Sequence, residues 1–169
     1  SSGEVRVVDE SGAEVPADGS TLGEITVRGN VVMAGYYNDP EKTEAAFWEG
    51  GWFRTGDLGV LDAEGRVTFR GRLKDMLKVG GENVAAVEIE GYLALHPAVK
   101  LAQVVGLRDE KYGEVPVAFI ELVPDAATTE TEIIDFCRGE IASFKIPQHV
   151  RFVEDWPMGA TKILKSALR

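Results

Sequence analysis

A change in hydrophobic patterning near Lys74 constrains the fold of this chain most strongly. Before Gly71, short runs such as residues 5–8 and 25–28 alternate apolar with polar side chains and are separated by glycine-containing turns. A period of two is typical of half-buried strands. After Gly71, helical and strand patterns follow one another without regular alternation. We therefore predict an α+β fold, with a β-rich part over residues 1–73 and a small mixed α+β domain over residues 74–169.

Local signals define the elements of the first part. Asp39 followed by Pro40 favours a helix start, so we expect a helix over residues 40–48. Residues 59–61 and 66–69 flank a glycine-containing loop, which predicts a β-hairpin. Ser1 and Ser2 precede the first alternating run, and we expect them to lead into a strand from upstream sequence.

The second part has clearer helix signals. We predict helices over residues 85–95 and 129–142, and strands over residues 99–107, 115–123 and 150–153. His96 and Pro97 end the first helix, and Thr129 with Glu132 forms a capping box that opens the second. Pro116 lacks a backbone N–H, so we expect its strand to begin at a sheet edge.

Charge and composition exclude several kinds of partner. The formal net charge of −10 disfavours general binding to nucleic acids or anionic membranes. No apolar run reaches the roughly 18–20 residues that a membrane span needs. The one cysteine, Cys137, lies in an apolar helical pattern and predicts core packing in a reducing compartment, which we take to be the cytoplasm.

Three segments carry more than fold information, and each has a plain structural alternative. Asp57 follows Gly56 beside a hairpin, where a carboxylate either caps a turn or accepts hydrogen bonds from vicinal hydroxyls. Arg72 and the pair Gly80-Gly81 suit close approach to a phosphate or ribose, or else form a basic hairpin with a glycine turn. Lys162 lies in a Gly/Thr loop and either meets an anion or is an exposed surface lysine.

Taken in order, these segments resemble the adenylate-forming (AMP-binding) enzymes, in particular the acyl-CoA synthetase and fatty-acid–CoA ligase branch. The matching motifs are residues 23–29 (GEITVRG), 35–38 (GYYN), 53–58 (FRTGDL), 71–75 (GRLKD), 80–84 (GGENV), 88–90 (EIE) and 136–147 (FCRGEIASFKIP). The resemblance covers nearly the whole chain. It implies that residues 1–73 end a large N-terminal domain and that residues 74–169 are the mobile C-terminal domain.

The resemblance also implies a reaction and residue roles. A carboxylic acid, by the branch a fatty acid, attacks ATP to give an acyl-adenylate, and CoA then displaces AMP. Lys162 would be the adenylation lysine and Lys74 the hinge between the half-reactions. The nucleotide would contact Asp57 and Arg72.

For CoA, the resemblance implies contacts with Gly80, Gly81, Phe144 and Lys145. Two positions depart from the family pattern. Thr161 stands where a glycine usually precedes the lysine, and Lys162 follows Pro157 by five residues in place of six. Ile146 and Gln148 stand where some relatives carry basic residues.

The phosphate loop and acyl pocket of the family match no segment here, so we expect them upstream, in an N-terminal domain missing from this chain. Mg²⁺ is expected with ATP, with no ligand assigned in this chain. We expect the isolated chain to be inactive, to expose apolar surface and to be prone to self-association. Two alternatives stay open: an adenylation domain that loads a carrier protein, and a stand-alone module that binds nucleotide or CoA.

Overall fold

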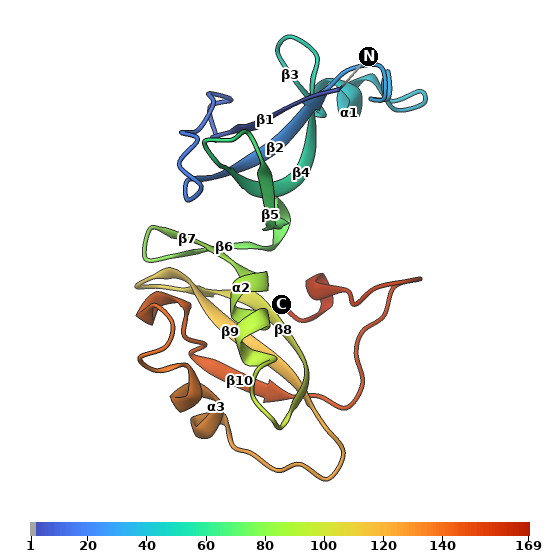
Figure 1. Ribbon diagram of the computed structural model, residues 1–169. Helices are drawn as coiled ribbons and strands as arrows, with labels where there is room; N and C mark the ends of the chain where they lie inside the picture. Colours follow the sequence, from blue (N-terminus) through green and yellow to red (C-terminus); the bar gives the residue numbers. More distant parts are fainter. Residues whose placement is uncertain (1–2) are drawn as a thin grey trace. The chain divides into compact units, whose positions relative to one another are not determined.

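The computed structural model describes residues 3–169 and divides into two compact units, Ser1–Lys74 and Asp75–Arg169 (Figure 1). The expected approach to the first strand at Ser1 and Ser2 lies outside the described residues. Each unit combines a sheet with one or more short helices, so the predicted α+β class is confirmed. Over residues 3–169, no helix has the length and apolar character needed to cross a membrane.

The first unit is an antiparallel sheet in the order β1-β2-β4-β3, with β5 also paired to β4. Its elements are β1 (Glu4–Val8), β2 (Leu22–Arg28), α1 (Pro40–Ala45), β3 (Phe47–Trp48), β4 (Trp52–Leu61) and β5 (Val67–Arg72). The predicted hairpin is confirmed as β4–β5. A 3₁₀ helix, η1 (Leu73–Asp75), follows it.

Helix α1 starts as predicted and ends earlier. The Asp39 carboxylate accepts a hydrogen bond from the Lys42 N–H at 3.0 Å, and Pro40 is the first helical residue. The helix ends at Ala45, whereas the sequence predicted residue 48. Gly50 and Gly51 both adopt a φ of +76°, which turns the chain back so that residues 47–48 pair with β4 as strand β3.

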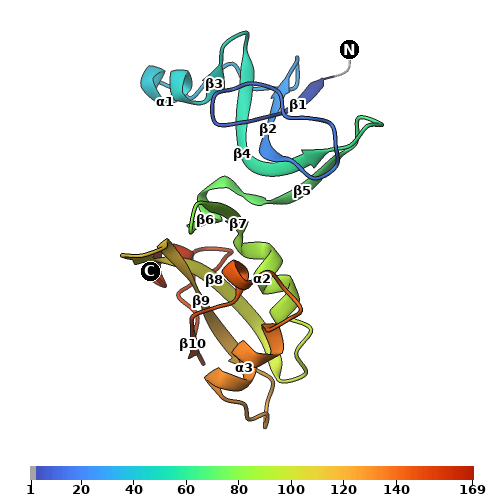
Figure 2. The same cartoon turned by 90° about the vertical axis from the view of Figure 1, so that its left-hand side faces the viewer.

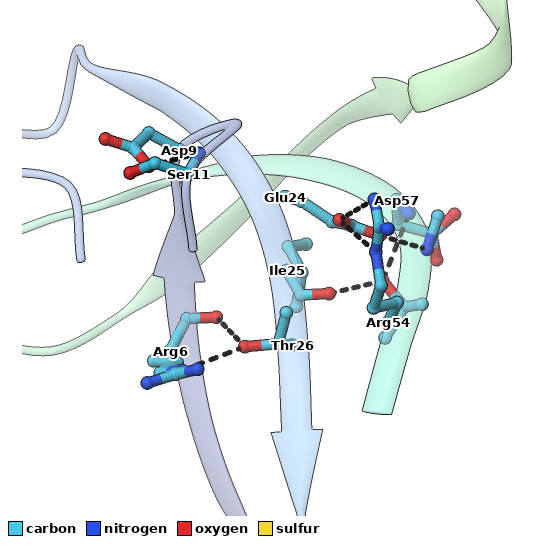
Figure 3. Close-up of polar contacts among 10 residues, drawn as sticks. Arg6, Asp9, Ser11, Glu24, Ile25, Thr26, Arg54 and Asp57 are labelled. Atoms are coloured by element: carbon cyan, nitrogen blue, oxygen red, sulfur yellow. Dashed lines mark hydrogen bonds and ion pairs between the residues drawn. The ribbon is translucent and has the colours of Figure 1, made fainter. Parts of the chain in front are cut away.

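Strand β2 buries polar side chains where alternation predicted apolar ones. Glu24 is 6% exposed and Thr26 is fully buried, while Ile25 and Val27 are only partly buried. Buried polar groups persist when they are hydrogen-bonded. The Thr26 hydroxyl accepts from Arg6 Nε at 3.3 Å and donates to the Arg6 carbonyl at 3.4 Å (Figure 3).

The second unit has a sheet in the order β10-β9-β6-β7, with β8 also paired to β9. Its elements are β6 (Met76–Val79), β7 (Glu82–Ala85), α2 (Ala86–Leu93), β8 (Val99–Asp109), β9 (Gly113–Leu122), α3 (Glu130–Cys137), η2 (Ser143–Lys145), β10 (His149–Phe152) and η3 (Lys165–Ala167). Strands β9 and β10 run parallel, and the other pairs are antiparallel.

Helices α2 and α3 pack against this sheet around one apolar cluster (Figure 2). Ile89 and Leu93 of α2 and Ile133 of α3 are almost fully buried in it. Cys137 lies in the same cluster as a free thiol, and burial raises its pKa to about 11. The predicted packing role of Cys137 is therefore confirmed.

Helix α3 begins as predicted and is shorter than predicted. Both hydrogen bonds of the capping box form: Thr129 Oγ1 accepts from the Glu132 N–H, and Glu132 Oε2 accepts from the Thr129 N–H. The helix ends at Cys137 because Arg138 is extended and Gly139 adopts a φ of +80°. The sequence had predicted that it would run to about residue 142.

The prediction that Pro116 marks an edge strand is wrong. Strand β9 is hydrogen-bonded on both sides, to β8 along its length and to β6 and β10 on the other side. Its parallel ladder with β10 begins at Val117, one residue after Pro116. The absent N–H therefore falls just before the point where that ladder starts.

Candidate functional site

Asp57 and Arg72 lie opposite each other on β4 and β5. Arg72 Nε is 3.0 Å from Asp57 Oδ1, as an ion pair whose side chains are 58% and 29% exposed. Within residues 3–169, Asp57 Oδ1 is nevertheless a buried atom with no hydrogen bond of suitable angle. Oδ1 is therefore shielded beside Arg72, and the 29% of the Asp57 side chain that is exposed is the part that a ligand hydroxyl can reach.

The part of β4 that leads into Asp57 is held by the buried Glu24 (Figure 3). Arg54 Nε donates to Glu24 Oε2 at 3.0 Å, and the Gly56 N–H donates to Glu24 Oε1 at 3.2 Å. The Thr55 hydroxyl donates to a backbone carbonyl of β2 at 2.7 Å and accepts from the Asp57 N–H at 3.0 Å. These bonds tie the residues just before Asp57 to strand β2.

Sequence reasoning assigned no role to Glu24. Its signal was present, because a glutamate stands between Gly23 and Ile25 inside a strand that was expected to bury one face. A buried carboxylate needs a cationic or N–H partner. Arg54, thirty residues later, supplies that partner and could not be assigned from local pattern alone.

Lys162 projects from a tight turn of the second unit. The Gly159 N–H donates to the Lys162 carbonyl at 2.7 Å, and the Leu164 N–H donates to the Pro157 carbonyl at 2.7 Å. Met158 and Ile163 form an isolated antiparallel bridge across the same turn. The Lys162 side chain is exposed, so its ammonium group is accessible to an anion.

Lys74 and the glycine pair lie at two other places. Lys74 is exposed within η1, as the last residue of the first unit. Gly80 and Gly81 form the exposed turn between β6 and β7, with φ of +59° and +89°. The Gly80 N–H donates to the Tyr112 carbonyl at 2.8 Å, which fastens this turn to the β8–β9 hairpin.

Phe144 and Lys145 lie in η2 and already have partners within the second unit. Lys145 Nζ donates to Glu88 Oε2 at 2.9 Å. Phe144 is partly buried against the apolar cluster, and Lys145 Nζ lies 6.0 Å from its ring centroid. A ligand that engages both residues would compete with Glu88 for the ammonium group.

The structure thus brings Asp57 and Arg72 together, and it holds the predicted residues of the second unit on three separate segments: the β6–β7 turn, η2 and the turn with Lys162. Two open clefts of about 430 and 470 Å³ contain none of the predicted site residues. Their linings are Glu121, Leu122, Ala126, Phe152, Val153 and Glu154 in one, and His96, Pro97, Ala98, Ala126, Ala127, Thr128 and Glu132 in the other. In the described part of the chain, no group of three or more His, Cys, Asp or Glu side chains is arranged to hold a metal.

Comparisons with known proteins match this arrangement. Residues 88–162 match the family model of the AMP-binding enzyme C-terminal domain. The chain is 45% identical to probable acyl-activating enzyme 4 of Arabidopsis thaliana over 94% of its own length and 30% of that protein. It is 43% identical to the mitochondrial medium-chain acyl-CoA ligase ACSF2 of Bos taurus, over 89% of its own length and 25% of that protein.

A solved structure agrees. ATP-bound MatB from Rhodopseudomonas palustris superposes on 99% of this chain with a TM-score of 0.90 and 37% identity, and 33% of the MatB chain is covered. The chain thus spans about a third or less of the length of these relatives. On these matches, residues 88–162 carry the C-terminal domain of the AMP-binding enzymes, and the chain is similar over almost its whole length to acyl-activating enzymes and acyl-CoA ligases.

Proposed function

We propose that this chain is the C-terminal portion of an AMP-forming acyl-CoA synthetase, an acid–thiol ligase that uses ATP and CoA. The observation that carries the proposal is the match over almost the whole chain to acyl-activating enzymes and acyl-CoA ligases. In this reaction a carboxylate oxygen bonds to the α-phosphorus of ATP and pyrophosphate leaves. The thiolate of CoA then bonds to the acyl carbon, and AMP leaves with the bonding electrons.

In this proposal Asp57 holds the ribose and Arg72 lies beside the nucleotide. The exposed part of the Asp57 side chain and the hydrogen bonds of the residues just before it support the role, because a ribose diol offers two donors to one carboxylate. Arg72 is more than half exposed, so its guanidinium can reach a ligand while Nε stays near Asp57. Together they would orient the sugar and leave the phosphates to other groups.

Lys162 would act in the adenylation step. Its exposed ammonium group would lie against the oxygens that gain negative charge as the carboxylate attacks the α-phosphate. The hydrogen bonds that close its turn keep the lysine backbone in one conformation. Thr161 replaces the usual glycine before it, and the turn still forms with Gly159 as the residue that donates to the Lys162 carbonyl.

Lys74 would be the hinge between the half-reactions. Support comes from its position at the end of the first unit, inside a three-residue 3₁₀ helix at an element boundary. A residue at such a place can absorb a large backbone change without disrupting a sheet. We propose residues 1–73 and 74–169 as the two domain portions that this hinge joins.

The CoA contacts would come from Gly80, Gly81, Phe144 and Lys145. The exposed turn with two positive φ angles allows a close approach of the pantetheine arm. Phe144 would stack on the adenine with the part of its ring that the core leaves open, and Lys145 would exchange Glu88 for a phosphate. We expect Mg²⁺ to accompany ATP and assign it no ligand among the described residues.

The lysine assignment is tested in a full-length enzyme that carries this chain. Lys162→Ala is expected to suppress acyl-dependent ATP–pyrophosphate exchange while thioester formation from supplied acyl-adenylate continues. Lys111→Ala, another exposed lysine of the second unit, is the matched control and should leave both half-reactions unchanged. Survival of both half-reactions in Lys162→Ala would refute the assignment.

The hinge and the acceptor have separate tests. Lys74→Pro should slow overall turnover by hindering the change between half-reactions, and unchanged turnover would contradict the hinge.

Discharge of the acyl-adenylate by free CoA without a carrier protein supports the synthetase over a carrier-loading domain. Calorimetry of the isolated chain should show weak or no binding of AMP and CoA, whereas tight binding would favour a stand-alone module.

Substrate, self-association and location are finer proposals. We propose a fatty acid as the acyl donor, which the name of the medium-chain ligase relative supports; rates with acids of increasing chain length test it. Val31 and Tyr37 are 86% and 100% exposed and favour self-association of the chain, to be measured by sedimentation velocity. We propose a cytoplasmic location, which the free, buried Cys137 suits. Cell fractionation would distinguish the cytoplasm from the peroxisome and the mitochondrion, which are named for two relatives.

A further inference from the structure

Two carboxylates of the second unit hold the ends of the segment that carries Lys162. At its start, Trp156 Nε1 donates to Glu121 Oε2 at 2.7 Å. At its end, Lys165 Nζ donates to Glu90 Oε1 at 2.5 Å. Eight residues thus separate the two attachments, and Lys162 is one of them.

The attachment at Lys165 is well shielded from water. The Lys165 and Glu90 side chains are only 17% and 14% exposed. Glu90 Oε1 also accepts from the Val104 N–H at 2.8 Å, which ties the carboxylate of α2 to strand β8. Removing one partner of such a pair leaves a largely buried charge without compensation, so the contact is expected to persist while the unit is folded.

The carboxylate that accepts from Trp156 is itself held by a second hydrogen bond, on its other oxygen. Glu121 lies on β9, and its Oε1 accepts from Lys100 Nζ of β8 at 2.5 Å. The Lys100 ammonium, and then the Trp156 indole, lower the pKa of Glu121 below its ordinary range. The carboxylate is therefore ionised at neutral pH and accepts on both oxygens.

We propose that the pairs Glu121–Trp156 and Glu90–Lys165 form a two-point clamp that positions Lys162 for adenylation. The four clamp residues touch no reacting atom and act only through the turn between them, so they are positioning residues. The inference rests on the proposed role of Lys162. Its physical basis is that a long lysine side chain delivers charge to a fixed point only when its backbone is fixed.

A structural test uses the chain itself. Lys165→Met keeps the length of the side chain and removes its ammonium group, and Trp156→Phe removes the indole donor. Each should accelerate amide hydrogen exchange at Gly159 and Leu164 by about tenfold or more, because both amides donate within the turn. Exchange in β8 and β9 should stay unchanged, and Lys111→Met is the control. Unchanged exchange at Gly159 and Leu164 in both variants would overturn the clamp.

A kinetic test uses a full-length enzyme carrying this chain. Lys165→Met should lower kcat of adenylation by about 10–100-fold, with little change in the KM for ATP, since the lysine is misplaced while nucleotide contacts remain. Thioester formation from supplied acyl-adenylate should be retained, and Lys165→Arg should restore most of the adenylation rate. A purely structural role would lower both half-reactions together, which would refute the proposal.

The two failures can be told apart. Loss of adenylation in Lys162→Ala with full adenylation in Lys165→Met and Trp156→Phe would overturn the clamp and leave the proposed function intact. Full adenylation in Lys162→Ala would overturn the lysine assignment on which the clamp depends. Glu90→Gln removes the charge of the carboxylate and keeps an acceptor for the Val104 N–H. It should lower the adenylation rate as Lys165→Met does, and agreement of the two variants shows that the loss is not due to misfolding of one of them.

Discussion

The two units are stabilised by different kinds of contact. Over residues 3–169, five of the buried apolar residues belong to the first unit and eighteen to the second. The first unit also buries Glu24 and Thr26, both hydrogen-bonded. Its tryptophans stack with arginines: Arg6 and Arg28 lie 4.2 and 4.5 Å from the ring centroid of Trp52.

The two kinds of contact have different effects: apolar packing stabilises a unit as a whole, and polar contacts fix the position of one segment. Apolar contacts have no preferred direction, and the second unit builds one contiguous apolar cluster that stabilises it. Directional polar contacts are better suited to holding a short segment at a fixed position, as Glu24 does for residues 54–56 just before Asp57. Four predictions test the comparison, in order of the expected effect.

The largest effect is expected in the core of the second unit. Leu93 is fully buried in α2, and Leu93→Ala should lower the free energy of unfolding of this unit by about 2–5 kcal/mol. Val87→Ala, at a 44% exposed position of the same helix, is the control. Urea titration followed by segment-resolved hydrogen exchange measures each unit. An equal loss of stability in the first unit would break the comparison.

A smaller loss is expected for the polar contact of the first unit. Glu24→Ala removes two acceptors and leaves Arg54 without its partner, which should cost about 2–3 kcal/mol. Glu4→Ala breaks the exposed pair with Arg28 and should cost clearly less. Fluorescence of the tryptophans during urea unfolding reports the change. Equal losses of stability in Glu24→Ala and Glu4→Ala would contradict the prediction that the buried carboxylate contributes more than the exposed one.

Glycines with a positive φ should behave alike in both units. Gly56 and Gly81 have φ of +70° and +89°, and neither has an atom near the position of an added Cβ. Alanine at each should cost about 1–2 kcal/mol through backbone strain alone. Gly91 lies in α2 with equal free space and no positive φ, so Gly91→Ala should stabilise by about 0.5–1 kcal/mol. Thermal unfolding measures all three, and a loss of stability in Gly91→Ala would contradict the reasoning.

The smallest effect concerns pH. The Thr129 N–H, followed by the hydroxyls of Thr128 and Thr129, lowers the pKa of Glu132. A lowered pKa means that ionised Glu132 stabilises the fold above the ordinary pKa of a glutamate, and that this contribution is lost as the pH falls through the folded-state pKa. The Tm of wild type should therefore fall more steeply than that of Glu132→Gln in this acid range. Parallel Tm curves would contradict the prediction, and Glu154→Gln is the control for charge.

Sequence predicted the parts of the fold that depend on near neighbours. The caps at Asp39 and Thr129 and the β4–β5 hairpin all arise from residues within a few positions of one another, and each is confirmed. The buried face of β2 could not be predicted, because it depends on Arg6 and Arg54, which are distant in the chain. Helix α3 was predicted to run to about residue 142, and it ends at Cys137, just before the extended Arg138 and Gly139 with its positive φ.

The candidate site shows the same limit. Sequence proposed Asp57, Arg72 and Lys162 from motifs, and the structure pairs Asp57 with Arg72 across two strands. Sequence did not suggest that Glu121 and Glu90 hold the lysine turn. Their partners lie 35 and 75 residues further along the chain, and only the folded topology brings them into contact.

The buried Cys137 has a practical consequence. Its thiol is inaccessible and carries a raised pKa of about 11, so maleimide reagents at neutral pH should leave the folded protein unmodified. A cysteine introduced at an exposed position of each unit could then be labelled without removing the native one. A pair of spectroscopic probes placed in this way would test the proposed rotation about Lys74 in a full-length enzyme that carries this chain.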